Sequence, residues 1–221
     1  MAVSGVAGKK LVREEKDVAE IRRPTQERGR QKFEVILDTV DQFLQTREPA
    51  DIGIYDIAEA LGTSPPSVYH FFPTVSLVFV ALAERYLEMF RRVDTILPGP
   101  FASWQQLLDE QCNQMLKVFE GNSAVRKVIL GVGYSSEIRS RDLENNRILA
   151  QHVLDGFRAH FVVPEIPGLL DRFIEMSAIN DAIWALYLHQ DGRLTDHAKE
   201  IASRARVAYL RTVLPEYLAT K

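Results

Sequence analysis

The chain has 221 residues, of which 46% are hydrophobic and 26% are charged. This balance predicts a globular protein with a sizeable core and excludes a disordered chain. The net charge of −3 at pH 7 gives no global sign of nucleic-acid binding, so such a function has to rest on a local patch. The single cysteine, Cys112, excludes an internal disulfide and fits a reducing compartment.

The sequence also lacks the patterns of a membrane segment, a metal site or a catalytic site. No stretch approaches the roughly 18 apolar residues of a membrane span, and the N-terminus has no apolar run of a signal peptide. We therefore expect a soluble, cytoplasmic protein with no membrane partner. No set of cysteines and histidines has zinc spacing, and no residue constellation supports an enzyme, so we expect no metal, no cofactor and no catalysis.

The first predicted elements are a charged arm and two helices. Residues 1–23 carry charges of both signs and predict a solvated arm. From Thr25, apolar residues recur at the spacing of an amphipathic helix, which has to stop before Pro49. A second, short helix is expected in "IYDIAEALG", and the Gly62 that follows suits a left-handed helix stop.

A third short helix and a long fourth helix are expected next. Ser64 has the character of an N-cap, and Pro65 occupies the first helical position, where a missing N–H costs nothing. We expect the Ser64 hydroxyl to accept a hydrogen bond from the N–H of Ser67. The fourth helix is predicted over residues 74–96, because apolar residues form a stripe along one side.

The second half of the chain predicts further helices and no strand. The segment "LPGPF" at residues 97–101 interrupts the helical pattern. Beyond it, a helix reaches about Glu120 and a shorter one is expected in "NSAVRKVILGVGYSS". Three long helices are predicted over residues 139–161, 169–189 and 195–217. The sequence therefore predicts an all-α fold.

Between Thr25 and about Leu87, the order of elements is characteristic: a long helix, then "DIAEALGTSPPSVYHFF", then a helix that leaves after one proline. The residues concerned are Asp56, Ile57, Ala58, Gly62, Ser64, Val68, Tyr69, Phe72 and Pro73, followed by Leu77 or Val78. At this spacing the chain resembles the TetR family of transcriptional repressors. The resemblance implies a three-helix DNA-binding domain over 24–73 with a helix-turn-helix, joined by the long fourth helix to a helical ligand-binding and dimerisation domain over 74–221.

The resemblance also implies which residues meet DNA. The third helix would enter the major groove, with packing by Val68, Phe71 and Phe72 and contacts by Ser64, Pro65, Ser67, Tyr69 and His70. The start of the first helix carries a basic cluster, Arg22, Arg23, Arg28, Arg30 and Lys32, which would lie beside the DNA backbone. An ordinary solvated helix start is the alternative for this cluster. Tyr55 is a further candidate DNA contact and stands where the family commonly has a basic residue, whereas Val75 stands where it commonly has a lysine.

The second domain would hold the dimer contact and an effector pocket. The helix over 169–189 is apolar over a wide arc, which predicts both a core and a partner. Candidate contacts in the last two helices are Phe173, Met176, Ile183, Ile201, Ala205 and Ala208. Candidate pocket residues are Gln111, Met115, Phe119, Tyr134, Asn180 and Trp184, each of which is also compatible with plain core or surface. Such a lining suits a hydrophobic or aromatic small molecule.

Two functional hypotheses follow. The first is a ligand-responsive repressor that binds a palindromic double-stranded DNA operator as a homodimer and is released by a small-molecule effector. The second is a helical protein-interaction module or adaptor in which DNA binding is weakened or lost. The missing lysine at Val75 and the negative net charge favour the second hypothesis. Operator-specific DNA binding would separate the two.

Overall fold

The computed structural model of the chain describes residues 20–131 and 135–221. One end of the molecule holds three helices and a short 3-10 turn: α1 (Glu27–Leu44), η1 (Pro49–Asp51), α2 (Ile54–Ala60) and α3 (Pro65–Tyr69). The remaining elements are α4 (Val75–Arg91), α5 (Trp104–Gly121), α6 (Ser123–Val125), the π-helical turn η2 (Arg126–Leu130), α7 (Ser136–His160), α8 (Leu169–Asp191) and α9 (Asp196–Leu210). Within the described ranges, β pairing is limited to one bridge between Phe161 and Thr220, so the all-α prediction is confirmed.

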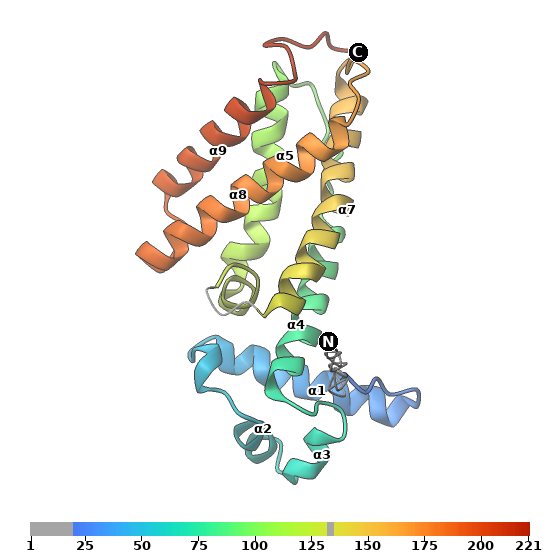
Figure 1. The fold of residues 1–221 in the computed structure, drawn as a ribbon, viewed down its shortest axis with the longest axis vertical. Coiled ribbons are helices and arrows are strands. Elements are labelled where there is room, and N and C mark those ends of the chain that lie inside the picture. The colour runs from blue at the N-terminus through green and yellow to red at the C-terminus, as the bar shows by residue number, and fades with distance from the viewer. Residues whose placement is uncertain (1–19, 132–134) are drawn as a thin grey trace, which may run out of the picture.

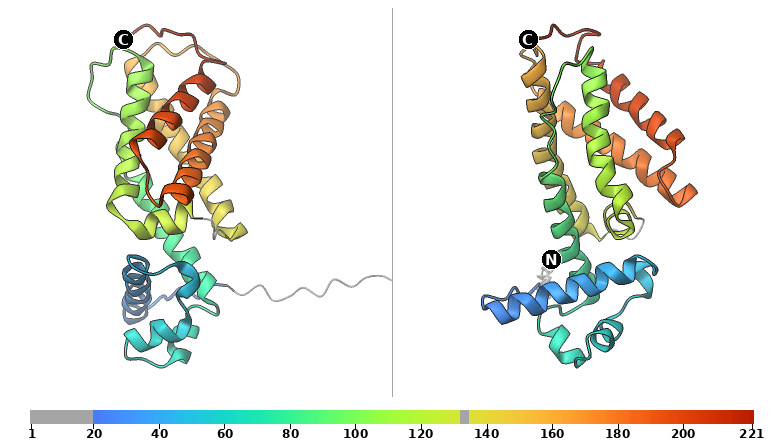
Figure 2. Two further views of the ribbon diagram at one scale, coloured as in Figure 1. Left: turned by 90° about the vertical axis from the view of Figure 1, so that its left-hand side faces the viewer. Right: turned by 180° about the vertical axis from the view of Figure 1, so that it is seen from behind.

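Figures 1 and 2 show how α4 joins two parts of the molecule. Helices α1, α2 and α3 gather at the lower end of Figure 1, and α4 rises from them to lie beside α7. Helices α5, α8 and α9 complete the upper part, with α8 and α9 packed against each other along one side. The chain therefore separates a small helix-turn-helix end from a larger helical bundle.

Two helices are shorter than the sequence pattern predicts, because local hydrogen bonds end them. Helix α4 stops at Arg91 rather than Ile96, where the Asp94 carboxylate accepts a hydrogen bond from the Ile96 N–H at 2.9 Å and turns the chain. Helix α9 stops at Leu210, and the Leu210 carbonyl accepts from the Leu214 N–H at 2.8 Å in a final turn before Pro215. Apolar spacing alone does not reveal these turns.

The core consists of two apolar clusters. The first cluster runs from α1, α2 and α3 through α4 to α6, η2 and Trp184. The second cluster lies at the far end of the bundle and contains Trp104, Phe157, Phe173 and Leu210. Several buried polar side chains lie in the bundle as well: Gln111, Asp142, Asn145, Asn146, Asn180 and Arg206.

Candidate DNA-contact face and ligand cavity

The turn before α3 has the backbone geometry that the sequence predicts. Gly62 has a φ of 57°, a left-handed conformation that favours glycine, and Ser64 is the extended N-cap with Pro65 first in the helix. The predicted side-chain cap is wrong, however. The Ser67 N–H donates to the Ser64 carbonyl at 2.9 Å, whereas the two serine hydroxyls lie 3.2 Å apart.

Helix α3 is held by aromatic packing beneath it. Val68 and Phe72 are fully buried, and Phe71 is nearly so. The Phe33 ring from α1 lies 4.7 Å from the Phe72 ring and 6.1 Å from the Phe71 ring, measured between centroids. A five-residue helix is too short to be stable alone, so this packing sets the direction in which its outer side chains point.

The opposite side of the helix-turn-helix reaches the surface. Tyr69 is 39% exposed and Tyr55, on α2, is 70% exposed. Ser64 and His70 are also exposed, while Pro65 and Ser67 are half-buried. The structure thus brings together on α2, α3 and their turn the uncharged side chains for which the sequence predicts DNA contacts.

The predicted basic cluster is only partly available. Arg28 and Arg30 are exposed at the start of α1, and Arg30 lies 3.7 Å from Glu27. Lys32 lines a shallow depression together with Pro66, Ser67, His70 and Phe71. Arg23 departs from the prediction, because its guanidinium pairs with Glu84 of α4.

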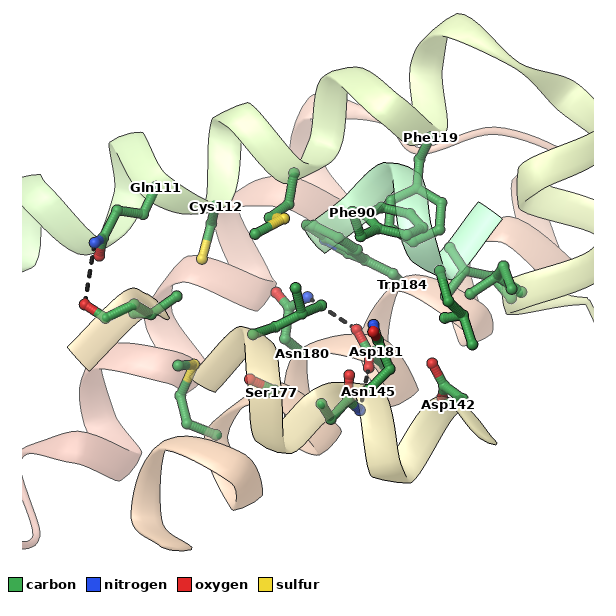
Figure 3. Close-up of a pocket in the computed structure, with 18 residues that line it drawn as sticks. Phe90, Gln111, Cys112, Phe119, Asp142, Asn145, Ser177, Asn180, Asp181 and Trp184 are labelled. Atoms are coloured by element: carbon green, nitrogen blue, oxygen red, sulfur yellow. Dashed lines mark hydrogen bonds between the residues drawn. The ribbon is translucent and has the colours of Figure 1, made fainter. Parts of the chain in front are cut away.

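A cavity lies inside the bundle, between α4, α5, η2, α7 and α8 (Figure 3). Five of the predicted pocket residues line it: Gln111, Met115, Phe119, Asn180 and Trp184. The sixth, Tyr134, lies outside the described residues. Three aromatic rings are neighbours in this wall. The Phe119 ring centroid lies 4.7 Å from that of Phe90 and 5.5 Å from that of Trp184.

The opposite part of the wall is polar, which the sequence reading missed. Asp142, Asn145 and Asn146 line the cavity from α7, and Asp181 from α8. Positions 142, 145 and 146 lie on one face of a helix. Three polar residues at this spacing are the sequence feature that could have predicted a polar wall. Burial, with a contribution from the Asp181 charge, raises the pKa of Asp142 to about 7, against the opposing effect of Arg139. Burial also raises the pKa of Asp181.

Several polar groups in this wall have fixed partners. The Gln111 amide donates to the Thr95 carbonyl at 2.7 Å and to the Val153 carbonyl at 3.1 Å. The Asn145 carbonyl oxygen accepts from Arg91 Nε at 2.7 Å. The buried Arg206 of α9 donates to the Asn180 side chain at 2.6 Å. These bonds hold the cavity wall to α4, α7 and α9.

The predicted dimer contacts divide into two groups. Phe173 is fully buried and Met176 nearly so, both in the second apolar cluster of their own chain, so the prediction of a partner contact is wrong for these two. They lie on the inner stripe of α8, which packs against the bundle. Ile183, Ile201 and Ala205 are half-buried and Ala208 is exposed. These four remain candidates for a partner contact.

The described residues offer little for other chemistry. No group of three or more histidine, cysteine, aspartate or glutamate side chains in residues 20–131 and 135–221 is arranged to hold a metal ion. Burial raises the pKa of the Cys112 thiol, which disfavours the thiolate that a nucleophile needs. No helix in these ranges is long and apolar enough to cross a membrane.

Comparisons with known proteins support the architecture. No protein-family model matches the sequence, and no curated protein matches it. Among solved structures, a TetR-family transcriptional regulator from Streptomyces coelicolor matches with a TM-score of 0.60 at 16% identity, over 82% of this chain and 79% of that one. A TetR transcriptional regulator from Rhodococcus sp. RHA1 matches with a TM-score of 0.61 at 15% identity, over 84% of this chain and 97% of that one. The TetR-family repressor AlkX from Dietzia sp. matches with a TM-score of 0.51 at 17% identity, over 83% of this chain and 98% of that one. The chain therefore has the fold of the TetR-family regulators.

Proposed function

We propose that the protein is a ligand-responsive transcriptional repressor that binds a palindromic DNA operator as a homodimer. The observation that carries the proposal is the exposed face of α3, where Tyr69 and His70 project from a helix anchored by Val68 and Phe72. A firmly held short helix with polar and aromatic outer side chains suits insertion into the major groove. The fold of the TetR-family regulators supports the same reading.

DNA contact divides between readout and positioning. Tyr69, His70 and Ser64 are uncharged donors and acceptors that suit base edges or sugar oxygens. Arg28 and Lys32 carry the charge, and neither forms an ion pair in the described ranges. With Arg23 already paired to Glu84, few cations remain per subunit, so the salt dependence of binding is expected to be moderate.

Operator binding is tested by selection from random duplexes followed by fluorescence anisotropy on the enriched sequence. We expect Tyr69→Ala to weaken binding by about tenfold or more, since a good base contact is worth about 1–3 kcal/mol. Tyr217→Ala is the matched control, because Tyr217 is 82% exposed in the C-terminal segment beyond α9. Failure to enrich any sequence, or equal binding by both variants, would overturn the repressor proposal.

A failed selection would favour the second candidate function, a protein-interaction module. The observation behind this alternative is the depletion of cations at the helix-turn-helix: Arg23 is paired, and α4 begins with Val75 rather than a lysine. Purification of the native chain would then be expected to recover a protein partner whose binding depends on Tyr55 or Tyr69.

Dimerisation would supply the second recognition helix that a palindromic operator needs. Leu186 of α8 is 51% exposed, and Ala208 of α9 is exposed as well. We propose that this side of α8 and α9 meets its copy in a second chain. Leu186→Arg should weaken the dimer at least about tenfold in sedimentation equilibrium. Val162→Arg, at a 57% exposed apolar residue in the loop after α7, should leave the dimer unchanged. An unaltered dimer in Leu186→Arg would refute this interface.

Ligand response would act through contacts between the cavity wall and the helix-turn-helix end. Turn η2 supplies Leu130 to the wall, and its Lys127 donates to the Arg47 carbonyl at 2.8 Å and pairs with Glu48 at 3.0 Å. On α7, Arg141 adjoins the wall residue Asp142 and pairs with Glu84. An effector that displaces η2 or α7 would therefore shift α1 and α4, changing the spacing of two recognition helices.

A further inference from the structure

The two carboxylates of the cavity differ in their partners. Asp142 is paired with Arg139 of the same helix at 3.0 Å. Asp181 accepts hydrogen bonds from the amides of Asn146, at 3.2 Å, and Asn180, at 3.4 Å. In residues 20–131 and 135–221, no cation lies within ion-pair distance of Asp181. The cavity thus contains one carboxylate that is held in place by neutral amides, has no ion-pair partner in the described ranges and is influenced by Arg139 only at longer range.

Three further polar atoms in the wall are buried without a hydrogen-bond partner among residues 20–131 and 135–221. They are Trp184 Nε1, Asn145 Nδ2 and Gln111 Oε1, on side chains that are 3%, 0% and 0% exposed. An unpaired buried polar group costs about 1–3 kcal/mol. All three side chains line the same cavity as Asp181; in Figure 3, Asn145 and Trp184 lie near Asp181, and Gln111 lies at the far end. Trp184 Nε1 and Asn145 Nδ2 are donors, so an acceptor oxygen on a ligand would recover part of this cost, whereas an ammonium group would not pair with them.

The rest of the wall suits a compact apolar body. Phe90, Phe119 and Trp184 present neighbouring rings, and the electron-rich faces of such rings attract cations. About 70 Å³ is open to the centres of water-sized molecules, compared with about 10–15 Å³ for a single water. The space therefore suits a small molecule rather than a long chain.

We propose that the cavity binds a compact organic cation, with an ammonium-type head beside Asp181 and an apolar or aromatic body against Phe119 and Trp184. The head supplies an ion-pair partner for Asp181, which has none in residues 20–131 and 135–221. An anionic head would add to the negative charge of the two carboxylates. The inference depends on the proposed function in one respect, namely that this cavity is the effector site. It differs from the hydrophobic or aromatic effector expected from the sequence by adding a positive charge.

Three probes that share a phenyl ring and differ in head charge test the proposal: 2-phenylethylammonium, 2-phenylethanol and 3-phenylpropionate. Binding to the full chain without DNA is measured by calorimetry and by tryptophan fluorescence, at about pH 8, where the carboxylates are more fully ionised. We expect the cation to bind at least about tenfold more tightly than the alcohol, and the carboxylate to bind most weakly. Equal or tighter binding of the alcohol or the carboxylate, or no binding of the cation at millimolar concentration, would overturn the proposal.

Asp181→Asn locates the effect, because the amide keeps the size and removes the charge. We expect the preference for the cation over the alcohol to fall to within about twofold in this variant. Asp191→Asn is the matched control, on the exposed last residue of the same helix, and should retain the preference. A preference that persists in Asp181→Asn would refute the role of Asp181, and circular dichroism verifies that the variant is folded.

The outcome is separable from that of the repressor proposal. The probe ranking needs no DNA, so a cation preference in a chain that selects no operator would leave the cavity inference standing and refute the repressor. Conversely, a specific operator with the reverse probe ranking would leave the repressor standing and refute the cation.

Discussion

The helix-turn-helix end and the cavity of the bundle place their polar groups in opposite ways. At the helix-turn-helix end, Val68 and Phe72 point inward and Tyr69 points outward. In the cavity, Asp142 and Asn145 are buried, and exposed apolar residues such as Leu186 lie on the outer side of the same bundle. The first arrangement stabilises the fold without any ligand, because burial of apolar surface supplies the free energy.

The second arrangement weakens the bundle on its own. A buried carboxylate and unpaired amides cost free energy that packing elsewhere has to offset. A ligand that pairs with them recovers this cost, so binding and stability are linked at the cavity. We expect the candidate DNA-contact face to be supported by a stable core and the cavity to be the adaptable part of the molecule.

The largest expected effect tests the apolar core of the helix-turn-helix end. Phe72→Ala removes a fully buried ring and should lower the free energy of unfolding by about 3–5 kcal/mol. Tyr69→Ala removes a ring of similar size from an exposed position and should lower the free energy of unfolding by less than about 1 kcal/mol. Urea unfolding measures both. Similar losses in the two variants would contradict the division between an anchoring and a free side of α3.

A smaller effect is expected at Gly156 of α7, where the bundle leaves no room for a side chain. An added Cβ would lie 2.6 Å from the Thr95 carbonyl oxygen and 2.1 Å from the Gln111 amide nitrogen. Gly156→Ala should therefore destabilise the protein by about 2–3 kcal/mol, although alanine favours helices in general. Gly121→Ala, at the end of α5 with open space around it, should be neutral or gain about 0.5 kcal/mol. Stabilisation by both variants would contradict this packing.

The acidic wall predicts a pH-dependent stability. Burial raises the pKa of Asp142 to about 7, so the folded chain keeps a proton that the unfolded chain releases near the ordinary value. Stability from this group is therefore fully present below the ordinary carboxyl pKa, is lost as pH rises from there through about 7, and changes no further at higher pH. The free energy of unfolding of Asp142→Asn, relative to that of the native chain, should rise by about 2 kcal/mol from about pH 5 to about pH 8. Urea unfolding of both proteins at the two pH values measures this. A difference that does not vary with pH would mean that Asp142 ionises normally.

The smallest expected change in stability concerns the ion pairs between the helix-turn-helix end and the bundle. Glu84 on α4 pairs with Arg23 before α1 and with Arg141 on α7. Glu84→Gln should cost about 1 kcal/mol, because Glu84 is partly shielded from water and serves two arginines. Glu34→Gln loses one weaker, exposed pair with Arg85 and should cost about 0.3 kcal/mol or less. Thermal unfolding compares the two, and equal costs would show that the Glu84 pairs are no stronger than surface pairs.

The sequence by itself determined the helical architecture and the helix-turn-helix end. The apolar spacing along α1, the glycine stop at Gly62 and the cap position at Ser64 are local signals, since each depends on residues within a few turns. The inward direction of Val68 and Phe72 follows from the same local pattern. Five of the six residues proposed for a pocket, with the guidance of the family resemblance, line one cavity, and their role in ligand binding stays a prediction.

Only the tertiary structure decided how the surfaces are used. Helix α8 is apolar over so wide an arc that its sequence alone does not show which side is inward, and the packing of the bundle buries Phe173 and Met176. Arg23 is separated from Glu84 by 61 positions, so no sequence spacing indicates their ion pair. The polar cavity likewise arises where α7 and α8 meet, because Asp142 and Asp181 become neighbours only when helices distant in sequence pack together.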